Sequence, residues 1–110
     1  MSAVVPLPRK VPHPGDLMKI IRRLAIEGKV EFSFHAFYER SEERGIDMPD
    51  ALKVLREGMI KGNIVPGNDP GEWKCKVADK AEGSSRSIGV VVVVIRQQRL
   101  RIVTVEWEDK

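Results

Sequence analysis

Residues 88–107 read IGVVVVVIRQQRLRIVTVEW, two apolar runs separated by a short polar segment. The first run, 88–95, consists almost entirely of valine and isoleucine. Such a run is typical of a strand with covered faces and hydrogen-bonded neighbours on both sides. The second run, 100–107, follows a turn around Gln97 and Gln98 and is predicted to pair antiparallel with the first. We therefore place 88–95 at the centre of a sheet.

A third strand is predicted upstream, in GEWKCKV at 71–77. Apolar Trp73, Cys75 and Val77 alternate there with charged side chains, which is the pattern of a half-buried strand. The preceding KGNIVPGNDPG, at 61–71, is dense in glycine and proline and is predicted as a loop. Cys75 is the only cysteine, so an intramolecular disulfide is excluded, and its position indicates a buried hydrophobe.

Helices are predicted before these strands. Apolar side chains recur at helical spacing after Asp16, and Gly28 is placed to end this first helix. A second helix is predicted to end at Gly45, with Phe34 and Phe37 facing the core.

A third helix is predicted to open at a capping box, in which the Asp47 and Asp50 side chains bond each other's backbone N–H groups. Its spacing directs Leu52, Leu55 and Met59 toward the core.

The chain of 110 residues has the size of one domain. Residues 1–15 are predicted as a proline-rich arm and 16–110 as a single domain. The predicted fold class is α+β, with two to three N-terminal helices packed on a small antiparallel sheet.

The composition, 42% hydrophobic and 32% charged, is that of a soluble globular protein. No apolar run approaches the length of a signal peptide or a membrane span, so we expect a cytoplasmic protein without a membrane partner. The sequence has none of the common metal, nucleotide or serine-nucleophile motifs, and we predict no metal and no cofactor.

Basic residues gather in the C-terminal half, where positions 83–105 contain no acidic residue. Cationic side chains in a line can contact a phosphate backbone, which suggests an RNA-binding surface. The candidate RNA-binding residues are Lys74, Lys76, Arg96, Arg99 and Arg101. The competing interpretation is that these side chains only protect an exposed face or edge of the sheet.

A second cluster lies on the predicted helix that ends at Gly45. His35 and Glu39 share one face of it, and Arg40 and Arg44 form an adjoining row. A carboxylate beside an imidazole suits a general base, and arginine can hold a phosphate. The competing interpretation is a solvated helix face with ordinary charge pairs.

Four segments, FSFHAFYERSEERGI at 32–46, ALKVLREGMI at 51–60, GEWKCKV at 71–77 and RIVTVEW at 101–107, resemble a known pattern. It is the F-S-x-H-A, R, E-R-G-I, V-L-x-x-G and V-T-V signature of a family of small bacterial domains of unknown function. That family is grouped with the RelE-like and MqsR-like toxin superfamily. This chain has three residues between Ala36 and the next arginine, where the signature has two.

The resemblance implies a RelE-like fold and a toxin-like endoribonuclease of the mRNA interferase type, without a metal. Its catalytic residues would be His35, Glu39, Arg40 and Arg44, and its partners would be RNA or the ribosome and an antitoxin protein. The alternative is a non-catalytic nucleic-acid-binding or partner-binding regulatory module of the same fold.

Overall fold

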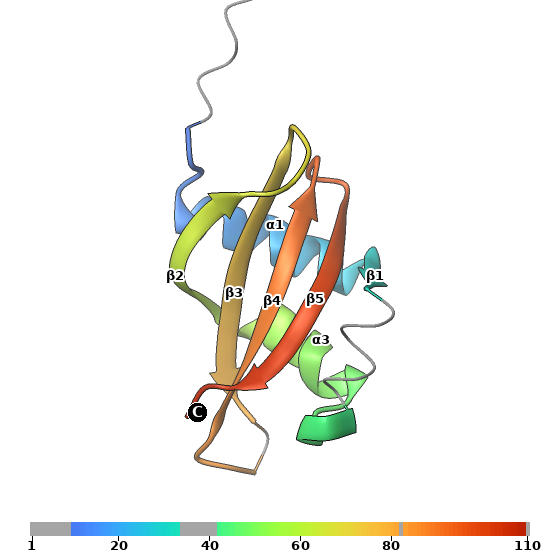
Figure 1. Cartoon of the computed structure of the whole chain (residues 1–110), viewed down its shortest axis with the longest axis vertical. Helices are drawn as coiled ribbons and strands as arrows, with labels where there is room; N and C mark the ends of the chain where they lie inside the picture. Colours follow the sequence, from blue (N-terminus) through green and yellow to red (C-terminus); the bar gives the residue numbers. More distant parts are fainter. Residues whose placement is uncertain (1–9, 34–41, 82, 110) are drawn as a thin grey trace, which may run out of the picture.

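The computed structural model describes residues 10–33, 42–81 and 83–109, and these form an α+β fold, as predicted (Figure 1). A five-stranded sheet is covered on one face by α1 and α3. The helices are α1 Pro14–Ile26 and α3 Met48–Glu57, and the strands are β1 Val30–Phe32, β2 Met59–Pro66, β3 Glu72–Lys80, β4 Ser87–Ile95 and β5 Arg99–Trp107.

The strand order is β1-β5-β4-β3-β2. The prediction that the valine-rich strand is central is confirmed, because β4 pairs with β3 on one side and β5 on the other, antiparallel in both cases. The sheet is larger than the sequence suggested and is mixed, since β1 pairs parallel with β5.

The prediction of a loop over 61–71 is wrong for its first half, which belongs to β2. Strand β2 is an edge strand in which only Ile64 is buried, and its register with β3 shifts between Lys61 and Val65. The irregularity accommodates Gly62, whose φ is 82°. An edge strand with a bulge tolerates glycine and a terminal proline, residues that otherwise indicate a loop.

Helix α1 begins two residues earlier than predicted because His13 is its N-cap. The Nδ1 atom of His13 accepts a hydrogen bond from the Gly15 N–H at 3.0 Å. Pro14 follows at the first helical position, where the missing N–H costs nothing. The chain leaves the helix at Gly28, whose φ of 74° lies in the left-handed region that glycine adopts without strain.

The predicted capping box of α3 is confirmed, with both Asp47 and Asp50 bonding the other's backbone N–H. Leu55 is fully buried as expected, but Leu52 is only partly buried. The prediction for Met59 is wrong, because the helix ends at Glu57 and Met59 begins β2, where 67% of its surface is exposed.

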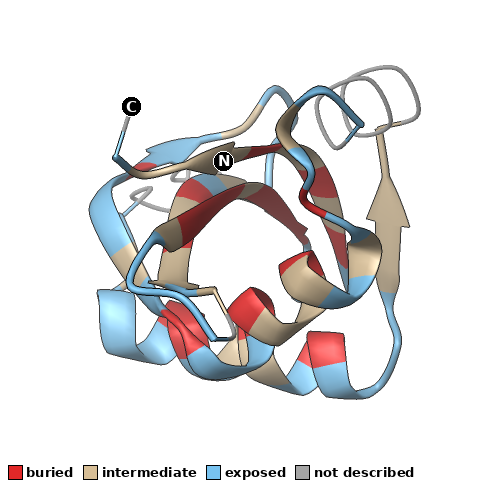
Figure 2. Cartoon of the chain, turned by 90° about the horizontal axis from the view of Figure 1, so that it is seen from below, coloured by how far each residue is buried: buried red, intermediate tan, exposed pale blue. Residues whose placement is uncertain are grey.

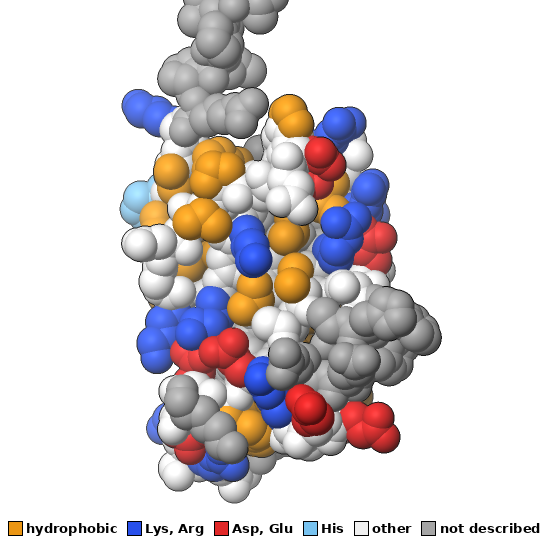
Figure 3. Space-filling model, viewed as in Figure 1, with side chains coloured by type: hydrophobic (Ala, Val, Ile, Leu, Met, Phe, Trp, Pro, Cys, Tyr) orange, Lys and Arg blue, Asp and Glu red, His pale blue; other side chains and the backbone are white. Residues whose placement is uncertain are grey.

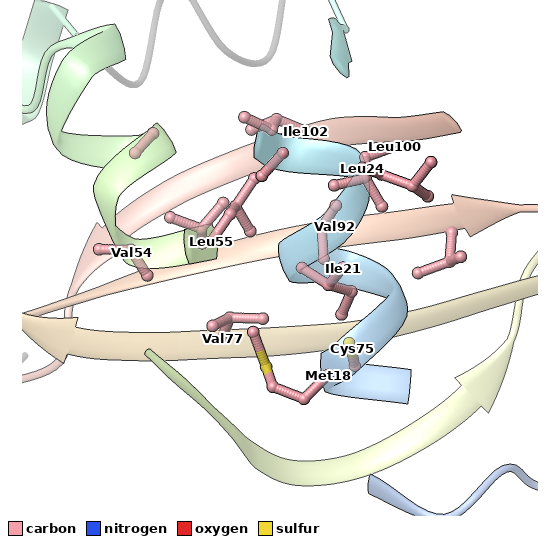
Figure 4. Packing of buried hydrophobic residues seen from close by; sticks show 14 of the residues in the cluster. Met18, Ile21, Leu24, Val54, Leu55, Cys75, Val77, Val92, Leu100 and Ile102 are labelled. Carbon is pink, nitrogen blue, oxygen red and sulfur yellow. The ribbon is translucent and has the colours of Figure 1, made fainter. Parts of the chain in front are cut away.

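The core lies between the helices and the sheet face that they cover (Figure 2). Ile21 of α1 and Leu55 of α3 meet Val92 of β4 and Leu100 of β5 there (Figure 4). Each buried side chain of this kind contributes roughly 1.5–3 kcal/mol of transfer free energy. The predicted core residues Phe34 and Phe37 lie outside the described residues.

Candidate nucleic-acid interface

The sheet face turned away from α1 and α3 is called the open face (Figure 3). Side chains on it alternate with core residues: Lys74 and Lys76 flank Cys75, which is buried beneath the helices. The register aligns Lys74 of β3 with Val93 of β4, and Val93 with Arg101 of β5. Lysine, valine and arginine thus form one row across three strands, and Figure 3 shows basic side chains among hydrophobic ones on this face.

One end of the open face is occupied by ion pairs. The Glu108 carboxylate lies 3.0 Å from the Nζ of Lys76 and 3.2 Å from the Nζ of Lys61. Glu106 approaches Lys76 to 3.7 Å. The Glu108 side chain passes over Gly89 of β4, where an added Cβ would lie 2.5 Å from its Oε2 atom. The predicted RNA-binding residue Lys76 therefore already has two carboxylate partners.

Opposing effects set the pKa of Glu108. Burial raises it, but hydrogen bonds and charge interactions with Lys76 and Lys61 outweigh burial, and the net pKa is lowered. The pKa of Lys76 is raised, chiefly by its hydrogen bond with Glu108, although burial opposes this. Both shifts favour the charged forms of the pair at neutral pH.

We expect Glu108→Gln to lower stability at neutral pH and to make it less sensitive to acid. Because the folded pKa of Glu108 is lowered, its ionised form stabilises the fold above the pKa of the unfolded chain, about 4.3. That contribution is lost as the pH falls through the folded pKa. The stability difference between wild type and variant should therefore be largest above that pH and shrink below it, as measured by urea denaturation at several pH values.

The matched control is Glu27→Gln, which removes a carboxylate from a more exposed pair with Lys29. We expect little change in stability from this control at any pH. If the free energy of unfolding of wild type and Glu108→Gln differed by the same amount at every acid pH, the lowered pKa of Glu108 would be contradicted.

The other end of the open face, called the turn end, includes the predicted residues Lys74, Arg96, Arg99 and Arg101. Arg99 and Arg101 share one carboxylate oxygen of Glu31, at 3.1 and 3.3 Å. Lys74 and Arg96 are exposed, and in the described part of the chain neither has an ion-pair or hydrogen-bond partner for its charged group. The turn end therefore keeps an excess of positive charge.

Arg44, a predicted catalytic residue, lies elsewhere. Its Nη1 donates a 2.6 Å hydrogen bond to the carbonyl oxygen of Val105, and its own carbonyl accepts one from Trp107 Nε1 at 2.7 Å. Arg44 is therefore hydrogen-bonded to the C-terminal part of β5. Its partner Val105 lies four residues after Arg101, a distance of about 13 Å along the strand. The structure does not bring Arg44 to the turn end, and the other predicted catalytic residues, His35, Glu39 and Arg40, lie outside the described residues.

Arg86 also belongs to the basic segment of the sequence, but it is neutralised. Its guanidinium donates two hydrogen bonds to the Asp109 carboxylate, at 2.8 and 3.0 Å, and lies 4.1 Å from the ring centroid of Trp107. The hydrogen bond with Asp109 raises the pKa of Arg86. The sequence signal for such pairing is the acidic group at 106–109, yet only the strand register shows which cation each carboxylate meets.

Cys75 is buried, as predicted, and burial raises the pKa of its thiol to about 12. A thiol with this pKa is almost entirely protonated at neutral pH and is a poor nucleophile. Within residues 10–33, 42–81 and 83–109, no three His, Cys, Asp or Glu side chains are grouped so that they could hold a metal ion. None of the described helices is long and apolar enough to cross a membrane.

Comparison with known proteins gives no relative from which a function could be transferred. No protein-family model matches the chain. No curated protein and no solved structure shows significant similarity to it.

Proposed function

We propose that the protein binds single-stranded RNA on the turn end of its open face. The observation that carries the proposal is a row of cations across the strands: Lys74 and Arg101 lie on either side of Val93, which is only 8% exposed between them. Cations contact phosphates without regard to base sequence, so the cations of this row can contact the backbone of an RNA strand. Lys74 and Arg96, which have no charged partner among the described residues, can bind a phosphate without breaking an ion pair.

Replacing Lys74 with alanine should weaken RNA binding and lower the salt dependence of binding. Loss of one phosphate contact is expected to reduce the slope of log affinity against log salt by about 0.7, the value for single strands. The measurement is fluorescence polarisation of a labelled single-stranded RNA at several salt concentrations. The matched control is Lys19→Ala, an exposed lysine on α1, on the opposite side of the sheet. Equal effects of the two substitutions would mean that RNA does not use the open face.

A second candidate function, RNA cleavage by a toxin-like endoribonuclease, is proposed on the resemblance to toxin-related domains. The guanidinium of Arg44 is hydrogen-bonded to the Val105 carbonyl, so this proposal assigns the chemistry to the other three predicted catalytic residues. In this proposal His35, assisted by Glu39, removes the proton from a ribose 2′-hydroxyl, and Arg40 neutralises the phosphate. An antitoxin partner would have to cover the cations of the turn end, so we expect it to be acidic.

Replacing His35 with alanine should abolish cleavage of single-stranded RNA, tested with and without ribosomes, while the thermal unfolding midpoint stays unchanged. The matched control is His13→Ala, because His13 is the only other histidine and caps α1. That control should cost about 1 kcal/mol of stability and leave cleavage intact. Full cleavage by the His35 variant, or no cleavage by the wild type, would remove the enzymatic proposal and leave RNA binding to be judged by itself.

A further inference from the structure

A pocket of about 270 Å³ opens beside the turn end, between α1 and the sheet. Its wall is apolar on the helix side, where Leu17 and Ile20 contribute, and on the sheet side, where Trp73 and Val94 contribute. At its polar rim lies Arg96. The pocket thus combines an aromatic ring, aliphatic walls and a cation.

Two residues of the β4–β5 turn, Arg96 and Gln97, form part of the pocket rim. Arg96 and Gln97 have φ values of 51° and 59°, in the left-handed region that non-glycine residues rarely adopt. The turn is fixed by hydrogen bonds from Arg96 N–H to the Gly71 carbonyl at 2.9 Å and from Gln98 N–H to the Ile95 carbonyl at 2.9 Å. Positive φ at both central residues is the pattern of a type I′ turn, a common connection between antiparallel strands, so the turn gives Arg96 and Gln97 fixed positions.

A second arginine, Arg23 of α1, contacts a residue that lines the pocket. Arg23 Nη2 donates a 3.0 Å hydrogen bond to the carbonyl oxygen of Gln97, which also lines the pocket. Its pairing with Glu27 is long, at 3.9 Å, and exposed. Arg23 thus holds a residue of the pocket wall, while Arg96 lines the pocket itself and can pair with an anionic group there.

The hydrogen-bonding state of the two tryptophans differs. Trp107 donates its indole N–H to the Arg44 carbonyl, whereas Trp73 Nε1 has no acceptor in the part of the chain that the structure describes. Trp73 can therefore offer both its ring and a hydrogen-bond donor to a ligand. Flat aromatic ligands such as nucleobases use both kinds of contact.

We propose that this pocket binds one nucleotide, with the base against Trp73 and the phosphate on Arg96. The proposal rests on the proposed RNA-binding function and names the part of the ligand that the pocket takes. The volume suits one base and not a larger ligand, because pockets for drug-sized molecules measure about 300–1,000 Å³. The nucleotide can come from the end or a turned-out position of an RNA strand on the open face, or it can be a free mononucleotide.

The test is two-dimensional proton–nitrogen NMR of the intact chain, in which the two indole N–H groups give separate signals, assigned by the loss of one signal in Trp73→Phe. Adenosine, guanosine, cytidine and uridine monophosphates are added in one series and a single-stranded RNA oligonucleotide in another. We expect the Trp73 signal to move saturably in both series and the Trp107 signal to stay in place. Movement only with mononucleotides would support the pocket and identify the free nucleotide as its ligand.

Arg96→Ala should weaken mononucleotide binding about ten-fold, the effect of losing one charge-assisted hydrogen bond, and Arg96→Lys should restore part of it. The matched control is Arg56→Ala, which replaces an exposed arginine in the last turn of α3 and should leave binding unchanged.

RNA binding that depends on Lys74 but leaves the Trp73 signal unmoved would overturn the nucleotide pocket and keep the proposed RNA-binding function. A Trp73 signal that moves while no RNA binds would overturn the RNA-binding function and keep the pocket.

Discussion

Replacing Ile21 with alanine is expected to lower the free energy of unfolding by about 3–4 kcal/mol. Ile21 is 0% exposed and projects from α1 into the core, near Val92 of β4 (Figure 4). The substitution removes buried aliphatic surface and leaves a cavity, because the sheet below and α3 beside it cannot close around the smaller side chain. Domains are typically stable by about 5–15 kcal/mol, so this one change should be plain in urea denaturation.

The matched control lies five residues further along the same helix. Ile26 is 71% exposed, so Ile26→Ala removes the same atoms from water and not from the core. Its effect should stay within about 0.5 kcal/mol. Equal losses for the two variants would contradict the described packing of α1 on the sheet.

Gly58→Ala should be the second large loss, about 2–3 kcal/mol. Gly58 is buried where α3 ends, and an added Cβ would lie 2.5 Å from the Ala78 carbonyl oxygen and 2.7 Å from that of Val54. Both obstacles are backbone, so the clash can be relieved only by moving α3 away from β3. The φ of Gly58 is −83°, an ordinary value, and the expected cost is therefore steric.

The matched control for Gly58→Ala is Gly15→Ala. It measures the effect of replacing a glycine with alanine where no backbone atom obstructs the added Cβ. An added Cβ at Gly15 would approach only the His13 ring, at 3.2 Å, which is a side chain that can shift. We expect at most about 1 kcal/mol of destabilisation there. Thermal unfolding of the two variants gives the comparison, and a Gly58→Ala protein as stable as the wild type would show that the junction of α3 and β2 is looser than described.

Much of the fold could be predicted because local signals agreed with the final packing. The β-branched run of β4 indicated a central strand, and Asp47 and Asp50 specified the start of α3. Two features of the sheet were not predicted, the strand β2 and the parallel pairing of β1, and each has a physical cause. Strand β2 has only one buried residue, so its sequence lacks the alternation that indicates a strand. The parallel pairing of β1 with β5 joins residues about seventy positions apart, and no local pattern reports it.

The candidate site was predictable only in part. Alternation of charged and apolar residues placed Lys74 and Lys76 together on the face opposite Cys75. It could not show that Glu108 lies beside Lys76, because that contact needs Gly89 to leave room above β4. Nor could it reveal the pocket at Trp73, which depends on how α1 crosses the end of the sheet.

The unequal charge at the two ends of the open face also bears on how a ligand arrives. The ion pairs of Lys61, Lys76, Glu106 and Glu108 are confined to one end, while Lys74 and Arg96 keep their charge at the other. Such a separation makes this face an electric dipole, which turns the molecule in the field of a polyanion before contact. An RNA strand would then meet the β4–β5 turn first in most encounters. The uneven charge of the open face thus acts on the association rate constant. Added salt should lower this rate constant strongly and change the dissociation rate constant less.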